Sequence, residues 1–182
     1  MKTLIVYTSQ TGFTKKYAGW IAERTNADLL DLKDAQKKDD VFFAKYDAIV
    51  YGGWAMAEKL VKAKWFLDKA PSWKKKRLAV FCVGGSTNDN PQAEKMLQNM
   101  LTDEQRKYIK AFYCQGGYNY EKMSVPCRMA MKMFVSALKK KKDASDKDRE
   151  LAEMISSSCD FSDIKYTDPI VDYLKDSVSL SA

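Results

Sequence analysis

Three hydroxyl side chains and a glycine lie close together between the first apolar segment of the chain and its first helical pattern. The segment reads Ser9, Gln10, Thr11, Gly12, Phe13 and Thr14. The first turn of a helix has unpaired N–H groups and a partial positive charge, so it attracts anions. We therefore interpret residues 9–14 as a phosphate-binding turn in which the hydroxyls donate hydrogen bonds and Gly12 allows close approach. The alternative is a simple helix cap, because Ser, Thr and Gly are common at such turns.

Other phosphate-binding and catalytic motifs do not fit. The chain has no G-x-x-x-x-G-K-[ST] and no G-x-G-x-x-G, which disfavours nucleoside triphosphatases and dinucleotide-binding domains. A phosphatase loop would need a cysteine at residues 9–14, and none is there. The chain has no histidine, which removes Ser-His and Cys-His nucleophiles and most transition-metal sites. Any chemistry must therefore come from a bound cofactor or from carboxylates.

Apolar strand patterns alternate with helical patterns along the first two thirds of the chain. We predict strands at residues 2–8, 28–32, 46–53, 77–85 and 110–117, with helices after the first strand, at about 57–69 and from Pro91. Three of these strands end in Gly-Gly. This predicts one α/β domain over residues 1–182, with a doubly wound, five-stranded parallel sheet covered by helices on both faces. In such sheets ligands bind at the carboxyl ends of the strands.

Extra helices are expected after the fifth strand. We predict an amphipathic helix at about 125–142, a short helix near 146–157, and a last helix that begins at Thr167 or Asp168 with Pro169 in its first turn. Residues 177–182 are expected to form a frayed tail.

The predicted helix at 125–142 is unusual in its charge. Seven basic residues and no acidic residue lie between Lys122 and Lys142, which equals the net charge of +7. At helical spacing, one side of this helix is apolar and consists of Met129, Met133, Phe134, Ala137 and Leu138. The helix can lie peripherally on an anionic membrane or cover a hydrophobic, negatively charged substrate. Alternatively its apolar side belongs to the core, and its lysines only complement the helix dipole.

Compartment and metal chemistry are predicted from what the chain lacks. No apolar run approaches the roughly 20 residues of a membrane span, and the first ten residues do not resemble a secretory signal, so we expect a cytoplasmic protein. Peripheral contact with the inner face of the membrane would come only from 125–142. The four cysteines form no C-x-x-C, so we expect no metal site and a structural role for the thiols. No nucleic-acid partner is predicted, because the basic residues lack interleaved aromatics.

The pattern Ser9-x-Thr11-Gly12-x-Thr14 directly after an amino-terminal strand resembles the flavodoxin signature that holds the phosphate of FMN. The order of elements and the segments YDAIVYGGWAMAEK, FYCQGGYNYEKMSVPCRMAMKMF and YTDPIVDYL resemble the flavodoxin-domain branch that contains the menaquinone-dependent, oxygen-independent protoporphyrinogen oxidases, over about residues 2–178. The resemblance implies FMN as cofactor, with its phosphate at residues 9–14. It implies that the ring lies against two loops, Gly53, Trp54, Ala55 and Met56 with Gly84, Gly85, Ser86 and Thr87, and against Tyr118.

Elementary chemistry supports these ring positions. Trp54 offers a face for stacking, and glycines let peptide groups reach the ring edge. The alternatives are an aromatic plug at the end of the sheet for Trp54 and an ordinary turn for the polar residues of GGSTNDN.

Two functions remain open at this point. The resemblance implies an FMN-dependent oxidoreductase that passes electrons from an organic substrate, such as a porphyrinogen, to a quinone. The alternative is a non-enzymatic electron carrier that docks on protein partners. Flavodoxins proper are acidic shuttles, whereas this chain is basic.

Overall fold

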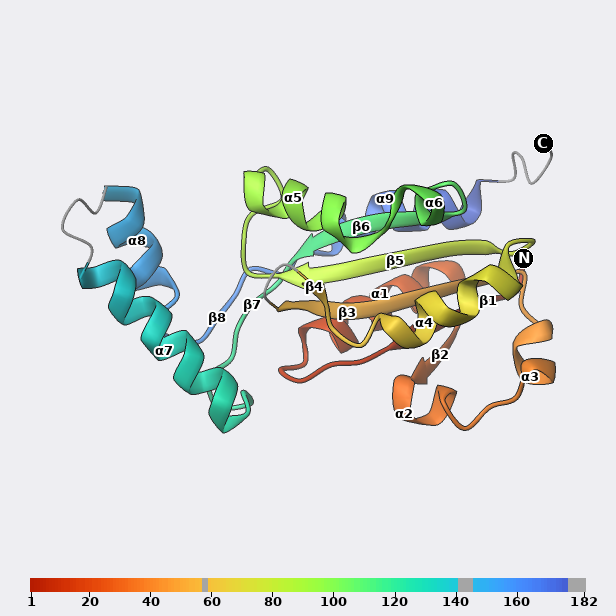
Figure 1. The fold of residues 1–182 in the computed structure, drawn as a ribbon, viewed down its shortest axis with the longest axis horizontal. Helices are drawn as coiled ribbons and strands as arrows, with labels where there is room; N and C mark the ends of the chain where they lie inside the picture. The colour runs from red at the N-terminus through yellow and green to blue at the C-terminus, as the bar shows by residue number, and fades with distance from the viewer. Residues whose placement is uncertain (57–58, 141–145, 177–182) are drawn as a thin grey trace.

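The protein is built around a parallel sheet of five strands in the order β2-β1-β3-β5-β6. The computed structural model describes residues 1–56, 59–140 and 146–176 (Figure 1). The strands are β1 (Thr3–Tyr7), β2 (Asp28–Asp31), β3 (Ala48–Met56), β5 (Arg77–Gly84) and β6 (Ile109–Gln115). Strand β1 pairs with both β2 and β3, so the strand order reverses there. This is the flavodoxin-like order, and it confirms the predicted fold class.

Helices cover both faces of the sheet, as predicted. Helices α1 (Phe13–Thr25) and α9 (Asp168–Lys175) pack on the face that carries Ile5, Val50 and Phe81. The other face carries Leu4, Ile49 and Val80 and packs against α4 (Lys64–Lys69), η1 (Ala70–Trp73) and α5 (Pro91–Met100). The short helices α2 (Leu32–Ala35), α3 (Asp40–Ala44) and α6 (Asp103–Arg106) complete the connections, and η2 (Ile164–Thr167) precedes α9. Apolar residues point to both faces because the strands are buried on both sides.

The predicted helix at 57–69 is wrong over its first half. Strand β3 runs on to Met56, and β4 (Lys59–Leu60) pairs back on it in antiparallel register, with Ala55 opposite Leu60. Lys62 has a left-handed φ of 57°, which a helix does not tolerate, so α4 begins only at Lys64. Residues 57 and 58 lie outside the described part of the chain. The segment 53–56 is therefore the end of a strand and not a loop.

The fifth strand also ends earlier than predicted. β6 stops at Gln115, and Gly117 and Tyr118 form β7, which pairs with β8 (Cys159–Asp160) in a short antiparallel ribbon. The sequence pattern did not reveal β8, because a two-residue strand has no periodicity. A β-carbon on Gly117 would lie 2.1 Å from the carbonyl oxygen of Cys159, so this close pairing needs glycine.

The ribbon carries a pair of helices beyond the carboxyl edge of the sheet (Figure 1). α7 (Val125–Lys140) and α8 (Asp146–Met154) pack against each other, with Val135 and Ala152 buried, as is Ile155 directly after α8. The predicted end of α7 at 141–142 and the predicted tail at 177–182 lie outside the described residues. α8 ends three residues before the predicted 157.

Candidate functional site

The turn between β1 and α1 presents the open amino terminus of a helix. Gly12 is the N-cap with φ 103° and ψ −24°, and no side chain among the described residues caps the helix. The Ser9 hydroxyl instead accepts a hydrogen bond from the Gly12 N–H at 3.2 Å within the turn. Gly12, and not a hydroxyl side chain, therefore occupies the N-cap position. The first-turn N–H groups remain directed at whatever approaches the turn.

Two adjoining cavities meet at this turn and share Thr11, Phe13 and Tyr118. One, of about 200 Å³, is mostly apolar and extends toward β3 and α7. The other, of about 410 Å³, is the more polar of the two, with polar and apolar atoms sharing its wall about equally, and it extends from Gly12 toward β8. Together they fall within the range of small-molecule sites, about 300–1,000 Å³. Their position beside β1 and β3 is the switch point where such sheets bind ligands.

Most of the predicted site residues line these cavities. The fold brings together four segments of the chain at the apolar cavity. The predicted residues that line it are Gln10, Thr11, Phe13, Thr14, Trp54, Ala55, Met56, Gly84, Gly85 and Tyr118. Gly12 lines the polar cavity. These residues lie together because parallel strands end at one edge of the sheet.

Four predicted residues, Ser9, Gly53, Ser86 and Thr87, line neither cavity. The Ser9 hydroxyl accepts the hydrogen bond from the Gly12 N–H within the turn. A β-carbon on Gly53 would lie 2.9 Å from Leu60 Cδ1, so this glycine makes room for β4. The Ser86 hydroxyl contacts Gln92 Oε1 at 3.2 Å, and the Thr87 carbonyl accepts the Asn90 N–H, so both belong to the start of α5.

The loop after β5 is held by β6. Asn88 accepts a hydrogen bond from the Gln115 N–H at 2.9 Å and donates one to the Tyr113 carbonyl at 3.1 Å. The Tyr113 hydroxyl donates to the Ser86 carbonyl at 3.0 Å. The Asn88 side chain and the Ser86 carbonyl therefore hold this loop against β6.

Tyr118 forms one wall of both cavities. A β-carbon on Gly85 would lie 2.1 Å from the Tyr118 hydroxyl oxygen, so the phenol rests directly on the glycine backbone. Burial, together with the nearby Cys159 thiol, raises the pKa of the Tyr118 phenol. The phenol is therefore protonated at neutral pH and is available as a hydrogen-bond donor.

Sequence reasoning missed the contribution of the ribbon and of α7. The apolar cavity is also lined by Val83, Gly117, Met123, Cys127, Ala130 and Met131, and the polar cavity by Lys16, Asn119, Lys122, Ser158, Cys159 and Asp160. Cys127, Ala130 and Met131 have i, i+3, i+4 spacing on α7, so this helical face was a readable signal. The four thiols are free, and two of them face the cavities instead of the core.

The apolar side proposed for α7 does not belong to the core. The exposed fractions of Met129, Met133 and Phe134 are 60%, 71% and 49%, and Val125 at the start of the helix is 68% exposed. The interpretation of this side as a core face is wrong, and the side is available for contact. Of the described helices, none is long and apolar enough to cross a membrane.

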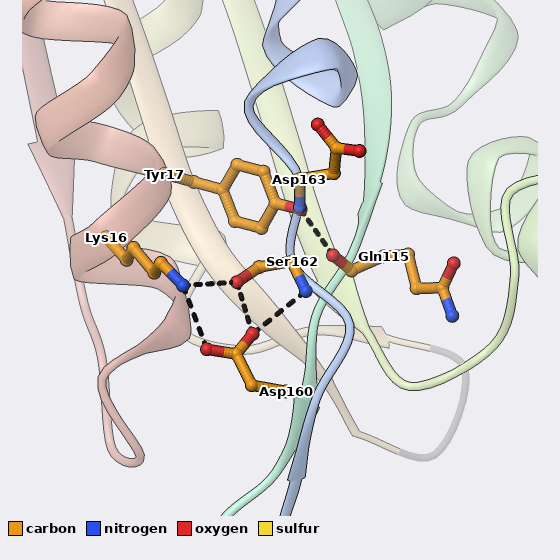
Figure 2. Close-up of polar contacts among 6 residues, drawn as sticks. All are labelled: Lys16, Tyr17, Gln115, Asp160, Ser162 and Asp163. Atoms are coloured by element: carbon orange, nitrogen blue, oxygen red, sulfur yellow. Dashed lines mark hydrogen bonds and ion pairs between the residues drawn. The ribbon is translucent and has the colours of Figure 1, made fainter.

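A polar cluster fastens the ribbon to α1, and Figure 2 shows its two parts. Lys16 Nζ lies 2.8 Å from Asp160 Oδ2 and 2.8 Å from Ser162 Oγ. Burial disfavours the Asp160 carboxylate, but hydrogen bonds from Lys16 and Ser162 outweigh it and lower its pKa. In the second part the Tyr17 hydroxyl donates to the Gln115 carbonyl and accepts the Asp163 N–H at 3.1 Å.

Within the described ranges, no three His, Cys, Asp or Glu residues gather in a way that would hold a metal ion.

Comparison with protein families agrees with the fold. The flavodoxin domain model matches residues 4–145, which include all the residues that line the apolar cavity. The chain belongs to the flavodoxin domain family. Solved structures with a similar fold include an archaeal flavodoxin, at 15% identity, covering 97% of this chain and 100% of that one with a TM-score of 0.43. No curated protein matches the chain.

Two further members of the fold come from bacteria. The flavodoxin WrbA-like protein of Agrobacterium tumefaciens is 21% identical, covering 82% of this chain and 98% of that one, with a TM-score of 0.48. The two-electron reduced flavodoxin of Megasphaera elsdenii is 20% identical, covering 84% and 97%, with a TM-score of 0.43. These likenesses concern the fold, and the family membership rests on the domain match.

Proposed function

We propose that the chain binds FMN across the two cavities and works as an oxidoreductase that passes electrons from an organic substrate to a quinone-type acceptor. The observation that carries the proposal is the junction of a polar and an apolar cavity at Thr11 and Phe13. FMN has the same division, with a phosphate at one end and a flat ring at the other. The membership of the flavodoxin domain family supports the same cofactor.

The polar end fits a phosphate. The uncapped start of α1 directs N–H groups toward it, and the space next to Gly12 is open, because a β-carbon there would have no neighbour within 4 Å. Thr11 lines both cavities and can donate its hydroxyl proton. We assign Thr11, Gly12 and Phe13 to the phosphate, with Gln10 and Thr14 on the side of the apolar cavity and Ser9 shaping the turn.

The apolar end fits a flat ring. Trp54 and Tyr118 offer aromatic faces, and Gly84 and Gly85 line the same cavity. The protonated Tyr118 phenol can donate a hydrogen bond. Met123, Cys127 and Met131 from α7 and the turn before it exclude water from the same space. When bound, FMN supplies two-electron redox chemistry between a donor and an acceptor.

The position of α7 favours an enzyme over a carrier. The helix lines the ring cavity with one side, so a protein partner would meet α7 before it met the ring. Its other side exposes Val125, Met129 and Met133, and Lys139 and Lys140 follow in its last turn. A hydrophobic, anionic molecule or an anionic membrane surface matches this combination. We therefore propose a quinone acceptor, a porphyrinogen-like donor, and peripheral contact of α7 with the membrane.

The decisive experiment has two stages. The purified protein is titrated with FMN, and binding is read from the quenching of flavin fluorescence. The loaded protein is then mixed with reduced porphyrinogens and other reduced donors, and with menaquinone or ubiquinone analogues as acceptors. We expect turnover with at least one donor and quinone pair. Absence of FMN binding would refute the cofactor, and binding without turnover on any pair would favour the electron carrier.

A further inference from the structure

The charges that line the polar cavity do not cancel. Its charged residues are Lys16, Lys122 and Asp160. Lys16 and Asp160 form an ion pair at 2.8 Å, and the Lys16 ammonium also binds the Ser162 hydroxyl. This pair is neutral as a unit. The remaining charge of the cavity lining is the ammonium of Lys122.

The Lys122 ammonium has no ion pair or hydrogen bond with any residue in the described part of the chain, whereas its backbone is held firmly. The Lys122 N–H donates to the Asn119 side chain at 3.0 Å and approaches the Asn119 carbonyl at 3.2 Å. Two residues before Lys122, the Tyr120 N–H donates a hydrogen bond to Ser158 Oγ at 3.0 Å, and the Tyr120 hydroxyl donates one to the Ile155 carbonyl at 2.5 Å. The turn that carries Lys122 is therefore fixed on the segment that leads into β8.

This fixed turn lines the same cavity as the open start of α1. Resting on the FMN binding proposed above, we infer that Lys122 is a further phosphate contact, which reaches the cofactor from the turn between β7 and α7. Residues 9–14 supply N–H and hydroxyl donors but no charged side chain. Lys122 supplies the cation, and Asn119 holds the turn that positions it. The site thus draws its charge from an element outside the phosphate-binding turn.

The size of the effect follows from the exposure of Lys122. An exposed pair of single charges changes an equilibrium by about one- to fivefold. A phosphate carries about 1.5 to 2 negative charges at neutral pH, so we expect loss of the ammonium to raise the FMN Kd by about three- to tenfold. The effect is largest at low salt and small at about 1 M salt, where the Debye length is about 3 Å.

The test compares Lys122→Gln with Lys132→Gln, which removes an exposed lysine of α7 that lines neither cavity. FMN and riboflavin are titrated into each variant and into the unmodified protein by fluorescence quenching, at low and at high salt. Riboflavin has the same ring without the phosphate, so it reports general damage to the site. We expect only Lys122→Gln to weaken FMN, only at low salt, and to leave riboflavin binding unchanged.

Two results would overturn the inference while leaving the proposed function intact. One is equal FMN affinity in the two variants and the unmodified protein. The other is a loss of FMN and riboflavin affinity by the same factor in Lys122→Gln, which would assign Lys122 a structural role. If the unmodified protein binds riboflavin and FMN equally weakly, the proposed cofactor is refuted and the inference with it.

Discussion

Gly12 and Gly19 are a matched pair for testing the turn at residues 9–14 and its proposed role in phosphate binding. Both belong to the region of α1, and a β-carbon added at either position would have no neighbour within 4 Å. The same change, glycine to alanine, is therefore free of steric overlap at both sites. The two differ in backbone conformation, because Gly12 has φ 103° and Gly19 lies inside the helix. Any difference between the variants reports the backbone alone.

The expected effects have opposite signs. Gly12→Ala places a β-carbon on a left-handed backbone, which costs about 1–2 kcal/mol of unfolding free energy. Gly19→Ala replaces glycine in a helix interior and stabilises the protein by about 0.5–1 kcal/mol. For a domain of this length, 1 kcal/mol shifts Tm by about 2–4 °C. We therefore expect Tm to fall by about 2–8 °C in Gly12→Ala and to rise by about 1–4 °C in Gly19→Ala.

The assay is thermal or urea unfolding of both variants, followed by FMN titration. Relief of the strain in Gly12→Ala would rotate the first-turn N–H groups, so we also expect weaker FMN binding in this variant and unchanged binding in Gly19→Ala. Shifts of Tm in the same direction would refute the assignment of Gly12 to a conformation that requires glycine. Unchanged FMN affinity in a destabilised Gly12→Ala would show that the turn does not bind the phosphate.

Three further predictions concern the phosphate turn, α7 and the ribbon. Thr11→Glu should abolish FMN binding by placing a carboxylate beside the phosphate, and unchanged affinity in a titration would move the site elsewhere. Met133→Gln should reduce sedimentation of the protein with phosphatidylglycerol vesicles, whereas the equally exposed Val41, changed to Thr, should have no effect; equal binding by all three proteins would contradict contact through α7. Asp160→Asn should lose about 0.2–1 kcal/mol of unfolding free energy at neutral pH. Because the pKa of Asp160 is lowered in the folded protein, this difference should begin to shrink below the unfolded value of about 4 and vanish as the pH falls through the lower folded value; a pH-independent difference would exclude the ion pair as its cause.

Periodicity predicted the parallel sheet because its central strands β3 and β5 are long and mostly buried on both faces. Runs such as residues 46–53 and 77–85 have few alternatives to a central strand, and Gly-Gly marked where two of them approach the site. The same reasoning predicted that Trp54 and Gly85 lie at the carboxyl edge of the sheet. It could not detect the hairpin of β3 and β4, because short pairing segments lack a period and depend on contacts such as Ala55 with Leu60.

The sequence by itself determined the fold class, the turn at 9–14 and the absence of histidine chemistry, since these depend on local pattern and residue type. Only the tertiary structure decided which side chains meet that turn. Lys122 and Asp160 are 38 residues apart, and the pairing of Gly117 with Asp160 in the ribbon brings their segments to one cavity. Such long-range pairing leaves no mark in a local pattern. For the same reason, the sequence did not decide which side of α7 packs inward, and packing decided that Cys127 lines the apolar cavity while Met133 faces outward.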